Sequence, residues 1–183
     1  MNSVVEIPTL TTERLVLRTP MASDFEAYAA SRAAPRTEFL GGPEDRIKAV
    51  FGFCALFGHW QMLGFGRWIV ADRQTDAPLG IVGLFFPEGW PEAEIAWSLF
   101  DNAEGRGFAF EAAFAARAYA YDTLGWTTAI SCIAPGNTRS LALAARMGAV
   151  FERDFVHDVY GPLPIYRHPS PSALAAEEGT PPV

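Results

Sequence analysis

The sequence predicts an α/β (α+β) fold in a single domain, and three observations carry this prediction. Apolar residues recur with a period of two in several short segments, which is typical of half-buried strands. Two segments rich in β-branched and aromatic residues follow each other as a hairpin. Further on, a strand, a long alanine-rich helix and another strand form a β-α-β unit, whose two strands we expect to be parallel.

The length fits one domain and a short tail, since 183 residues compare with roughly 150 for a typical domain. We place the domain at residues 1–168. Residues 169–183 are small, polar or proline-rich, so we expect them to form a disordered tail. Half of the residues are hydrophobic, which is enough to build a core.

The charge and the cysteines exclude several classes of protein. A net charge of −7 leaves no excess cation to bind phosphates, so no nucleic-acid partner is expected. Cys54 and Cys132 lack a metal-like spacing, so we expect no disulfide and no metal site. No apolar run reaches the roughly 20 residues that span a membrane, and residues 1–6 do not resemble a secretory signal. We therefore expect a cytoplasmic protein without a membrane partner.

The first half of the chain predicts two helices and three strands. Residues 14–18 alternate as a strand, and Ser23 or Asp24 caps a helix that ends near Arg32. A second helix is predicted from Glu44 to about Leu63. Its apolar face is expected to contain four residues, namely Ile47, Val50, Phe51 and Cys54. Residues 68–71 and 79–84 then form the hairpin.

The second half predicts the β-α-β unit and a closing segment. Its first strand spans residues 93–100 and carries Glu94 among apolar neighbours. The alanine-rich helix runs from about Arg106 to Leu124, and residues 128–133 form the next strand. A fourth helix then spans residues 137–147, and one or two last strands end near Tyr166.

Two glycines stand where the alanine-rich helix begins, in the segment Gly105-Arg106-Gly107-Phe108-Ala109. The unpaired N–H groups of a first helical turn attract anions, and small residues let a phosphate approach the backbone. This pattern is compatible with a pyrophosphate site. A tight strand-to-helix turn with no ligand is the alternative interpretation.

The order of motifs along residues 11–168 resembles the GNAT N-acetyltransferases, and within them the RimJ/RimL-like (ribosomal-protein-alanine acetyltransferase-like) branch. The motifs that carry the resemblance are Thr12-Glu13-Arg14-Leu15, Gly105-Arg106-Gly107-Phe108-Ala109, Glu111-Ala112-Ala113, Asn137-Thr138-Arg139-Ser140, Met147-Gly148-Ala149 and Ile165-Tyr166-Arg167-His168-Pro169. The resemblance implies a central mixed, mostly antiparallel sheet of about six to seven strands, with one parallel pair and four flanking helices.

The same resemblance implies transfer of an acetyl group from acetyl-CoA to a primary amine, on a protein N-terminus or a small aminated metabolite. It assigns the pyrophosphate to backbone amides of the loop and the pantetheine to the edge of strand 93–100. The implied cofactor-binding residues are Leu99, Arg106, Gly107, Phe108, Ala109, Asn137 and Ser140. Asn137 and Ser140 have an alternative interpretation as an ordinary helix cap and first-turn residue. Glu104 departs from the family pattern, because a carboxylate beside a pyrophosphate has to point away.

The reaction requires a base for the amine, and a donor for the departing thiolate. Glu94 is the candidate base, because we expect partial burial on the strand before the loop to raise its pKa. A simply solvated carboxylate at a strand edge is the alternative interpretation. Ser140 and Tyr166 are the candidate acids, although a catalyst that mainly orients its substrates needs neither. We expect a backbone N–H of the strand to hold the oxyanion.

The aromatic residues and the histidines contribute less to the prediction of the site. Trp60, Phe65, Trp68, Trp90 and Trp97 are either acceptor-pocket or core residues. We assign no catalytic role to the three histidines. A non-catalytic acyl-CoA binder or sensor, and a plain α/β interaction domain, are the alternative functions. A homodimer is compatible with the predicted enzyme.

Overall fold

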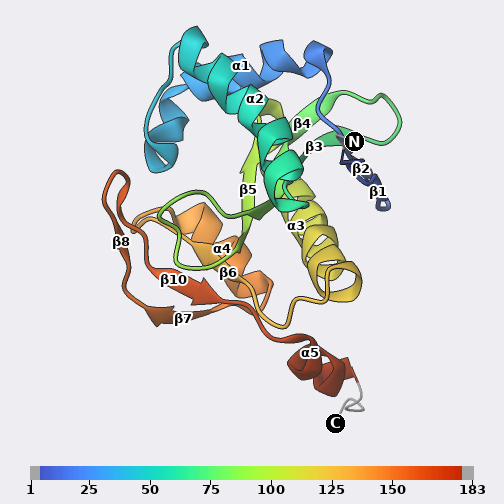
Figure 1. Ribbon diagram of the computed structural model, residues 1–183, viewed down its shortest axis with the longest axis vertical. Coiled ribbons are helices and arrows are strands. Elements are labelled where there is room, and N and C mark those ends of the chain that lie inside the picture. The colour runs from blue at the N-terminus through green and yellow to red at the C-terminus, as the bar shows by residue number, and fades with distance from the viewer. Residues whose placement is uncertain (1–4, 179–183) are drawn as a thin grey trace.

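A computed structural model describes residues 5–178 and confirms the predicted fold class (Figure 1). Its main sheet has eight strands, in the order β1-β2-β3-β4-β5-β6-β10-β7, where six to seven were predicted. All neighbouring strands are antiparallel except the pair β5 and β6. The bounds are β1 (Leu10–Thr11), β2 (Leu15–Arg18), β3 (Arg67–Asp72), β4 (Pro78–Phe85), β5 (Glu94–Leu99), β6 (Ile130–Cys132), β7 (Val150–Arg153) and β10 (Ile165–Arg167). A separate short hairpin joins β8 (Val156–His157) to β9 (Gly161–Pro162).

Five α-helices surround the sheet, one more than predicted. They are α1 (Phe25–Ala33), α2 (Arg46–Leu63), α3 (Phe108–Ala118), α4 (Thr138–Arg146) and α5 (Pro171–Glu178). The predicted helix 106–124 is α3 followed by one π-helical turn, Tyr119–Thr123. None of the helices in residues 5–178 combines the length and the apolar character needed to span a bilayer.

The hairpin β3–β4 separates two layers of core. Trp68 and Val82 lie opposite each other and pack in the same cluster as α3, whereas the neighbouring pair Ile69 and Ile81 packs with α1 and α2. Because successive strand residues face opposite sides, one hairpin serves both layers. The helices α1 and α2 therefore cover one face of the sheet and α3 the other.

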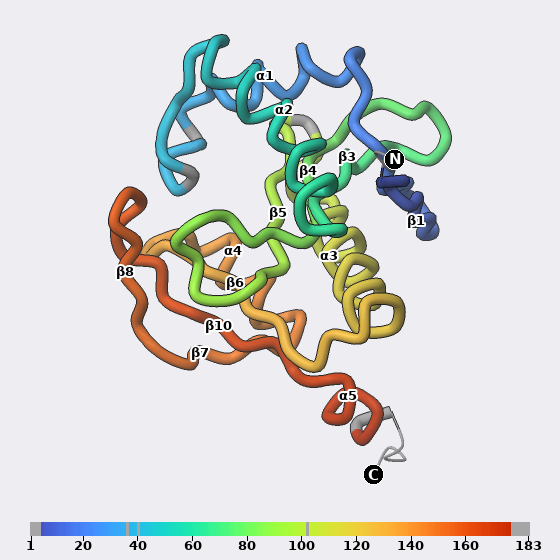
Figure 2. The backbone as a smooth tube through the Cα atoms, viewed as in Figure 1, coloured from blue at the N-terminus to red at the C-terminus, as the bar shows by residue number. Residues whose placement is uncertain are grey.

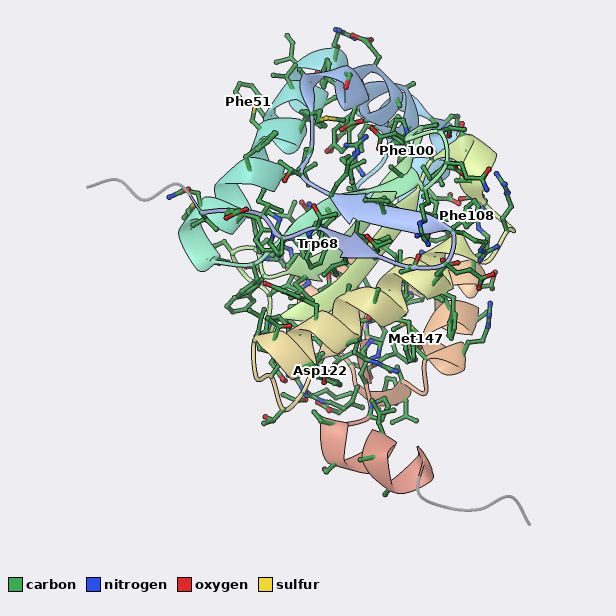
Figure 3. All side chains as sticks on the ribbon, turned by 90° about the vertical axis from the view of Figure 1, so that its right-hand side faces the viewer. Phe51, Trp68, Phe100, Phe108, Asp122 and Met147 are labelled. Atoms are coloured by element: carbon green, nitrogen blue, oxygen red, sulfur yellow. The ribbon has the colours of Figure 1, made fainter. Side chains whose placement is uncertain are left out.

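The predicted apolar face of α2 is wrong. Ile47 and Phe51 are each 71% exposed, and Phe51 points away from the body of the molecule (Figure 3). Val50 and Cys54 are exposed as well. The residues that α2 buries are instead Ala49, Phe53, Leu56 and Trp60. The helix is apolar on nearly every side, so periodicity alone cannot choose the face that meets the sheet.

The predicted tail also differs from the structure. Residues 171–178 form α5, whose Leu174 packs against the main core, and the Ser170 hydroxyl accepts a hydrogen bond from the Ala173 N–H at 3.2 Å. This helix follows β10 at the end of the molecule opposite α1 and α2 (Figure 2). Residues 179–183 lie outside the described part of the chain.

The parallel pair β5 and β6 separates soon after it forms. Glu94 pairs with Ile130, and this is the single register pair between the two strands in the described residues. On its other side β5 stays paired with β4 from Glu94 to Leu99. From Ala96 onward, the β6-facing edge of β5 therefore borders an opening in the sheet.

Candidate active site

The loop before α3 presents unpaired backbone donors. Gly105 and Gly107 have positive φ angles of 72° and 80°, and Gly107 is the residue that precedes the helix. The Glu111 N–H donates to the Gly107 carbonyl at 3.2 Å. Within the described residues, the N–H groups of positions 106–110 form no hydrogen bond. A helix start with free donors is suited to an anion.

Glu111 fixes this loop against the start of β2. Its carboxylate accepts hydrogen bonds from the Thr12 hydroxyl at 2.6 Å and from the Arg14 N–H at 2.9 Å. Arg14 returns a side-chain hydrogen bond to the Arg106 carbonyl at 3.0 Å. These bonds fix the backbone of the loop, and the Arg106 carbonyl points toward Arg14.

Glu104 does not leave a free negative charge beside these donors. Its carboxylate forms an ion pair with the Arg139 guanidinium of α4. The departure from the family pattern at this position is therefore compensated by a cation, and an anion at the start of α3 does not meet an uncompensated carboxylate.

Two cavities lie on either side of the opening in the sheet. The loop cavity, of about 370 Å³, is lined by the helix start and α4, including Leu99, Gly105, Gly107, Ala109 and Arg139. The carboxylate cavity, of about 430 Å³, lies below α1 and α2 and includes Tyr28, His59, Arg67, Glu94 and Cys132. Both volumes are in the range of small-molecule sites.

The two cavities meet at β5 and the start of α4. Trp97, Ser98, Asn137 and Ser140 line both. The Asn137 side chain caps α4 by accepting the Ser140 N–H at 3.2 Å, which confirms the cap interpretation. The Trp97 indole N–H donates to the Ser140 hydroxyl at 3.1 Å. This bond occupies Ser140 Oγ as an acceptor and leaves its own proton for another partner.

Glu94 lies at the wall of the carboxylate cavity and is only 6% exposed. Its Oε2 accepts a hydrogen bond from the Cys132 N–H at 2.7 Å. Burial raises the pKa of Glu94 to about 7, against the smaller opposing effects of Cys132, Trp90 and Arg67. A carboxylate with such a pKa can exchange a proton near neutral pH.

Of the other predicted residues, some line a cavity and others pack in the core. Tyr166 lines neither cavity and packs instead beside Phe151 and the small cluster around Ile133. The side chain of Phe108 is buried in the core, and the Arg106 guanidinium lies over its ring, so neither side chain lines the loop cavity. Trp60 and Trp68 are core residues, whereas Trp90 and Trp97 line a cavity.

The histidines serve structural contacts. His59 uses both ring nitrogens on backbone groups of Phe65 and Phe86, at 2.8 and 3.0 Å. His168 is 1% exposed and contacts the Ser131 hydroxyl through Nε2 at 3.0 Å. Burial lowers the pKa of His168 to about 3, so its ring is neutral. Among the side chains that the structure describes, His, Cys, Asp and Glu form no group of three or more suited to a metal ion.

The sequence did not indicate that Arg67 lines a cavity, and it predicted Trp97 only as an acceptor-pocket or core residue. Arg67 stands at the first position of β3, in a segment that predicts only a strand. Its arrival beside Glu94 depends on the pairing of β3 with β4 and β5, which no local pattern encodes. The alternation of side chains along β5 could have indicated a role for Trp97. It places the ring on one face of the strand just before the loop that precedes α3, where it faces either the core or a cavity.

A mixed sheet that opens between two parallel strands, beside the unpaired start of a helix, matches the fold of a solved acetyltransferase. The model of the family described as Acetyltransferase (GNAT) domain matches residues 14–150. The chain therefore belongs to the GNAT acetyltransferase family, and acetyl transfer is its general activity. That family uses acetyl-CoA.

Solved structures agree with this assignment. An acetyltransferase from Agrobacterium tumefaciens str. C58 is 36% identical, with a TM-score of 0.82 over 92% of this chain and 98% of that one. A putative ribosomal-protein-serine acetyltransferase from Vibrio cholerae is 23% identical, with a TM-score of 0.70 over 87% and 95%. A spermidine N-acetyltransferase from Vibrio cholerae, solved with CoA and spermine, is 19% identical, with a TM-score of 0.70 over 90% and 99%. The last two similarities concern the fold alone.

Proposed function

We propose that this protein transfers an acetyl group from acetyl-CoA to the nitrogen of a primary amine. The observation that carries the proposal is the junction of two cavities at β5, one beside the free donors of the α3 start and the other containing Glu94. Two substrates that approach from opposite sides meet at this junction. The acceptor is a protein N-terminus or a small aminated metabolite, and a RimJ/RimL-like assignment, a homodimer and a cytoplasmic location stay predictions.

The loop cavity is the proposed site of acetyl-CoA, which supplies an activated thioester. The free N–H groups of positions 106–110 and the positive end of α3 are suited to the pyrophosphate. Leu99 and Asn137 border the same cavity, where the edge of β5 beyond its register pair with β6 can receive an amide-bearing arm. The residues present therefore fit the co-substrate.

Glu94 is the proposed base. An alkyl ammonium cannot attack a thioester, so one proton must leave the nitrogen before the C–N bond forms. With a pKa of about 7, Glu94 is largely ionised at slightly alkaline pH and can accept that proton. Glu94 lines the carboxylate cavity but not the loop cavity, so it meets the amine rather than the thioester.

Ser140 is the proposed partner of the leaving thiolate. When the C–S bond breaks, the sulfur needs a hydrogen-bond donor or a proton. Trp97 already donates to Ser140 Oγ, which strengthens the hydroxyl as a donor. Tyr166 lines neither cavity and is the weaker candidate. A backbone N–H of β5 is the proposed stabiliser of the oxyanion.

A non-catalytic acyl-CoA binder or sensor has less support. The argument for it is a carboxylate at position 104 beside the proposed pyrophosphate, and the ion pair with Arg139 compensates that charge. A binder also has no use for a buried carboxylate with a pKa near neutrality, which is costly to maintain.

The test is turnover of acetyl-CoA with a panel of primary amines. It is measured for wild type and for Glu94→Gln from about pH 6 to about pH 10, in steps of about one pH unit. The amide keeps the shape and removes the base, so we expect kcat to fall by roughly 10² to 10⁴-fold at neutral pH, with acetyl-CoA affinity little changed. The deficit should shrink at high pH, where the free amine is abundant.

The matched control is Glu88→Gln, which neutralises an exposed carboxylate in the turn before β5 and should leave the rate unchanged. A deficit that does not vary with pH would mean that Glu94 orients the amine rather than accepting its proton. Binding of acetyl-CoA without turnover of any amine would favour the sensor.

A further inference from the structure

Arg67 places a guanidinium in the wall of the carboxylate cavity. It lies on the same side of β3 as Ile69, the side that faces α1 and α2. Its partner across the hairpin is Gly83, which has no side chain to fill the space. The guanidinium lies over the Phe85 ring, with Cζ 3.9 Å from the ring centroid. Stacking fixes the plane of the guanidinium and leaves its N–H edge to other partners.

That edge has no acceptor in the described part of the chain. The Arg67 side chain forms neither a hydrogen bond nor an ion pair there, and it stacks on the Phe85 ring. Burial lowers the pKa of Arg67, as expected of a cation that loses water without gaining an anion. Arg67 is half-buried. Since a partly desolvated cation without an anion does not stabilise the fold, an arginine at this position is better explained by a ligand than by stability.

The other charged groups of the cavity do not compensate it. Arg32 is bonded to Glu44 at 2.6 and 2.9 Å. Both nitrogens of His59 are used by backbone groups, and burial lowers its pKa, so this ring is neutral. Glu94 forms no ion pair with Arg67, although its charge acts on it. Among the described lining residues, Arg67 is therefore the cation without an anionic partner.

We propose that the acceptor amine also carries a carboxylate, which binds to the edge of Arg67 while the amine is next to Glu94. This inference rests on the proposed acetyl transfer. A carboxylate has one charge and two coplanar oxygens, which match a single guanidinium edge. A phosphate brings more negative charge than one guanidinium balances, and a polyamine places a second cation beside Arg67. The substrate class is thus an amino acid, or a peptide with an acidic side chain near its N-terminus.

The experiment compares matched acceptors on the wild-type enzyme. Each of several α- and ω-amino acids is paired with its primary amide, and a peptide with aspartate as second residue is paired with its asparagine analogue. Spermidine represents the cations. We expect kcat/KM to be about 10- to 100-fold higher for the acid than for the amide in the pairs that are acetylated. Free amino acids and the peptide distinguish the two sources of the carboxylate.

Variants then assign the preference to Arg67. Arg67→Gln should erase the difference between acid and amide, mainly through the KM of the acid, and Arg67→Lys should retain part of it. The control is Arg46→Gln, at an exposed arginine paired with Glu26 on the surface. Unchanged acetyl-CoA affinity by calorimetry establishes that each variant is folded.

The outcomes separate the two proposals. Turnover of amines with equal rates for acids and amides, or an acid preference that survives in Arg67→Gln, overturns the role of Arg67 and leaves acetyl transfer intact. A preference for spermidine also overturns it. Absence of turnover with every acceptor, despite acetyl-CoA binding, overturns the proposed function itself. The wild-type pairs decide the question even where Arg67→Gln fails to fold.

Discussion

At the scale of single residues, the carboxylate cavity contains two charges that a stable core does not need. Glu94 and Arg67 both lose water on folding, yet they do not form an ion pair with each other. A direct pair would hold the pKa of Glu94 low and occupy the guanidinium. Their separation keeps the carboxyl near neutrality and the arginine available, which is what a substrate with two charged ends requires.

The pKa of Glu94 also predicts a stability change with pH. Its folded value of about 7 lies above the ordinary 4.5, so the folded chain binds this proton more tightly than the unfolded chain. Ionisation therefore destabilises the fold progressively from pH 4.5 upward, and fully above pH 7. Glu94→Gln mimics the protonated acid. Its free energy of unfolding should exceed that of wild type by up to about 3 kcal/mol at pH 8.

Urea titration of both proteins at several pH values provides the measurement. Near pH 4 both side chains are uncharged, and the difference should disappear. An equal difference at acid and alkaline pH would contradict the raised pKa, because it would indicate a packing effect of the amide.

At the scale of elements, the start of α3 depends on a glycine whose φ of 80° disfavours other residues. A Cβ at Gly107 would contact Arg14 Nη2 at 3.5 Å, which is an ordinary distance, so conformational strain and the lost approach to the backbone are the main effects. Gly107→Ala should weaken acetyl-CoA binding at least about 10-fold, measured by calorimetry.

Gly125→Ala is the matched control for that measurement. Gly125 has a similar φ of 70°, has open space around its Cβ position and lies at the far end of the same helical segment. Both variants should lose similar stability, while Gly125→Ala retains its affinity. Equal losses of affinity would show that strain alone, and not the anion site, explains the effect.

Elements were predictable where the signal is local. The alternation of Leu15 and Leu17, and the glycines at 107, 125 and 148, predicted the strands and helix ends because each acts on its own backbone. The buried face of α2 was not predictable, since Phe51 and Phe53 are equally apolar and tertiary packing chooses between them. Sequence could single out Glu94 as a candidate because a carboxylate interrupts an apolar strand, whereas the position of Arg67 in the cavity depends on the sheet pairing.

At the scale of the whole molecule, α5 extends the core beyond the predicted domain end. Leu174 packs against the same cluster as α3, so Leu174→Ala should lower the free energy of unfolding by about 1 to 2 kcal/mol. Ala175→Ser, at an exposed position of the same helix, should change it by less than about 0.5 kcal/mol. Chemical denaturation measures both. Identical stabilities would support the disordered tail instead.

The meeting of the two cavities at β5 has a consequence for the order of events. Cys132 lines the carboxylate cavity, but burial and the neighbouring Glu94 raise the pKa of its thiol well above the usual range, so it is a poor nucleophile. We therefore expect no acetyl-enzyme intermediate on this thiol, so that both substrates must be bound at the same time. Double-reciprocal plots of the initial rate, at several concentrations of the second substrate, should give intersecting lines, as in a sequential mechanism. Cys132→Ala should keep that pattern. Parallel lines would indicate a ping-pong enzyme.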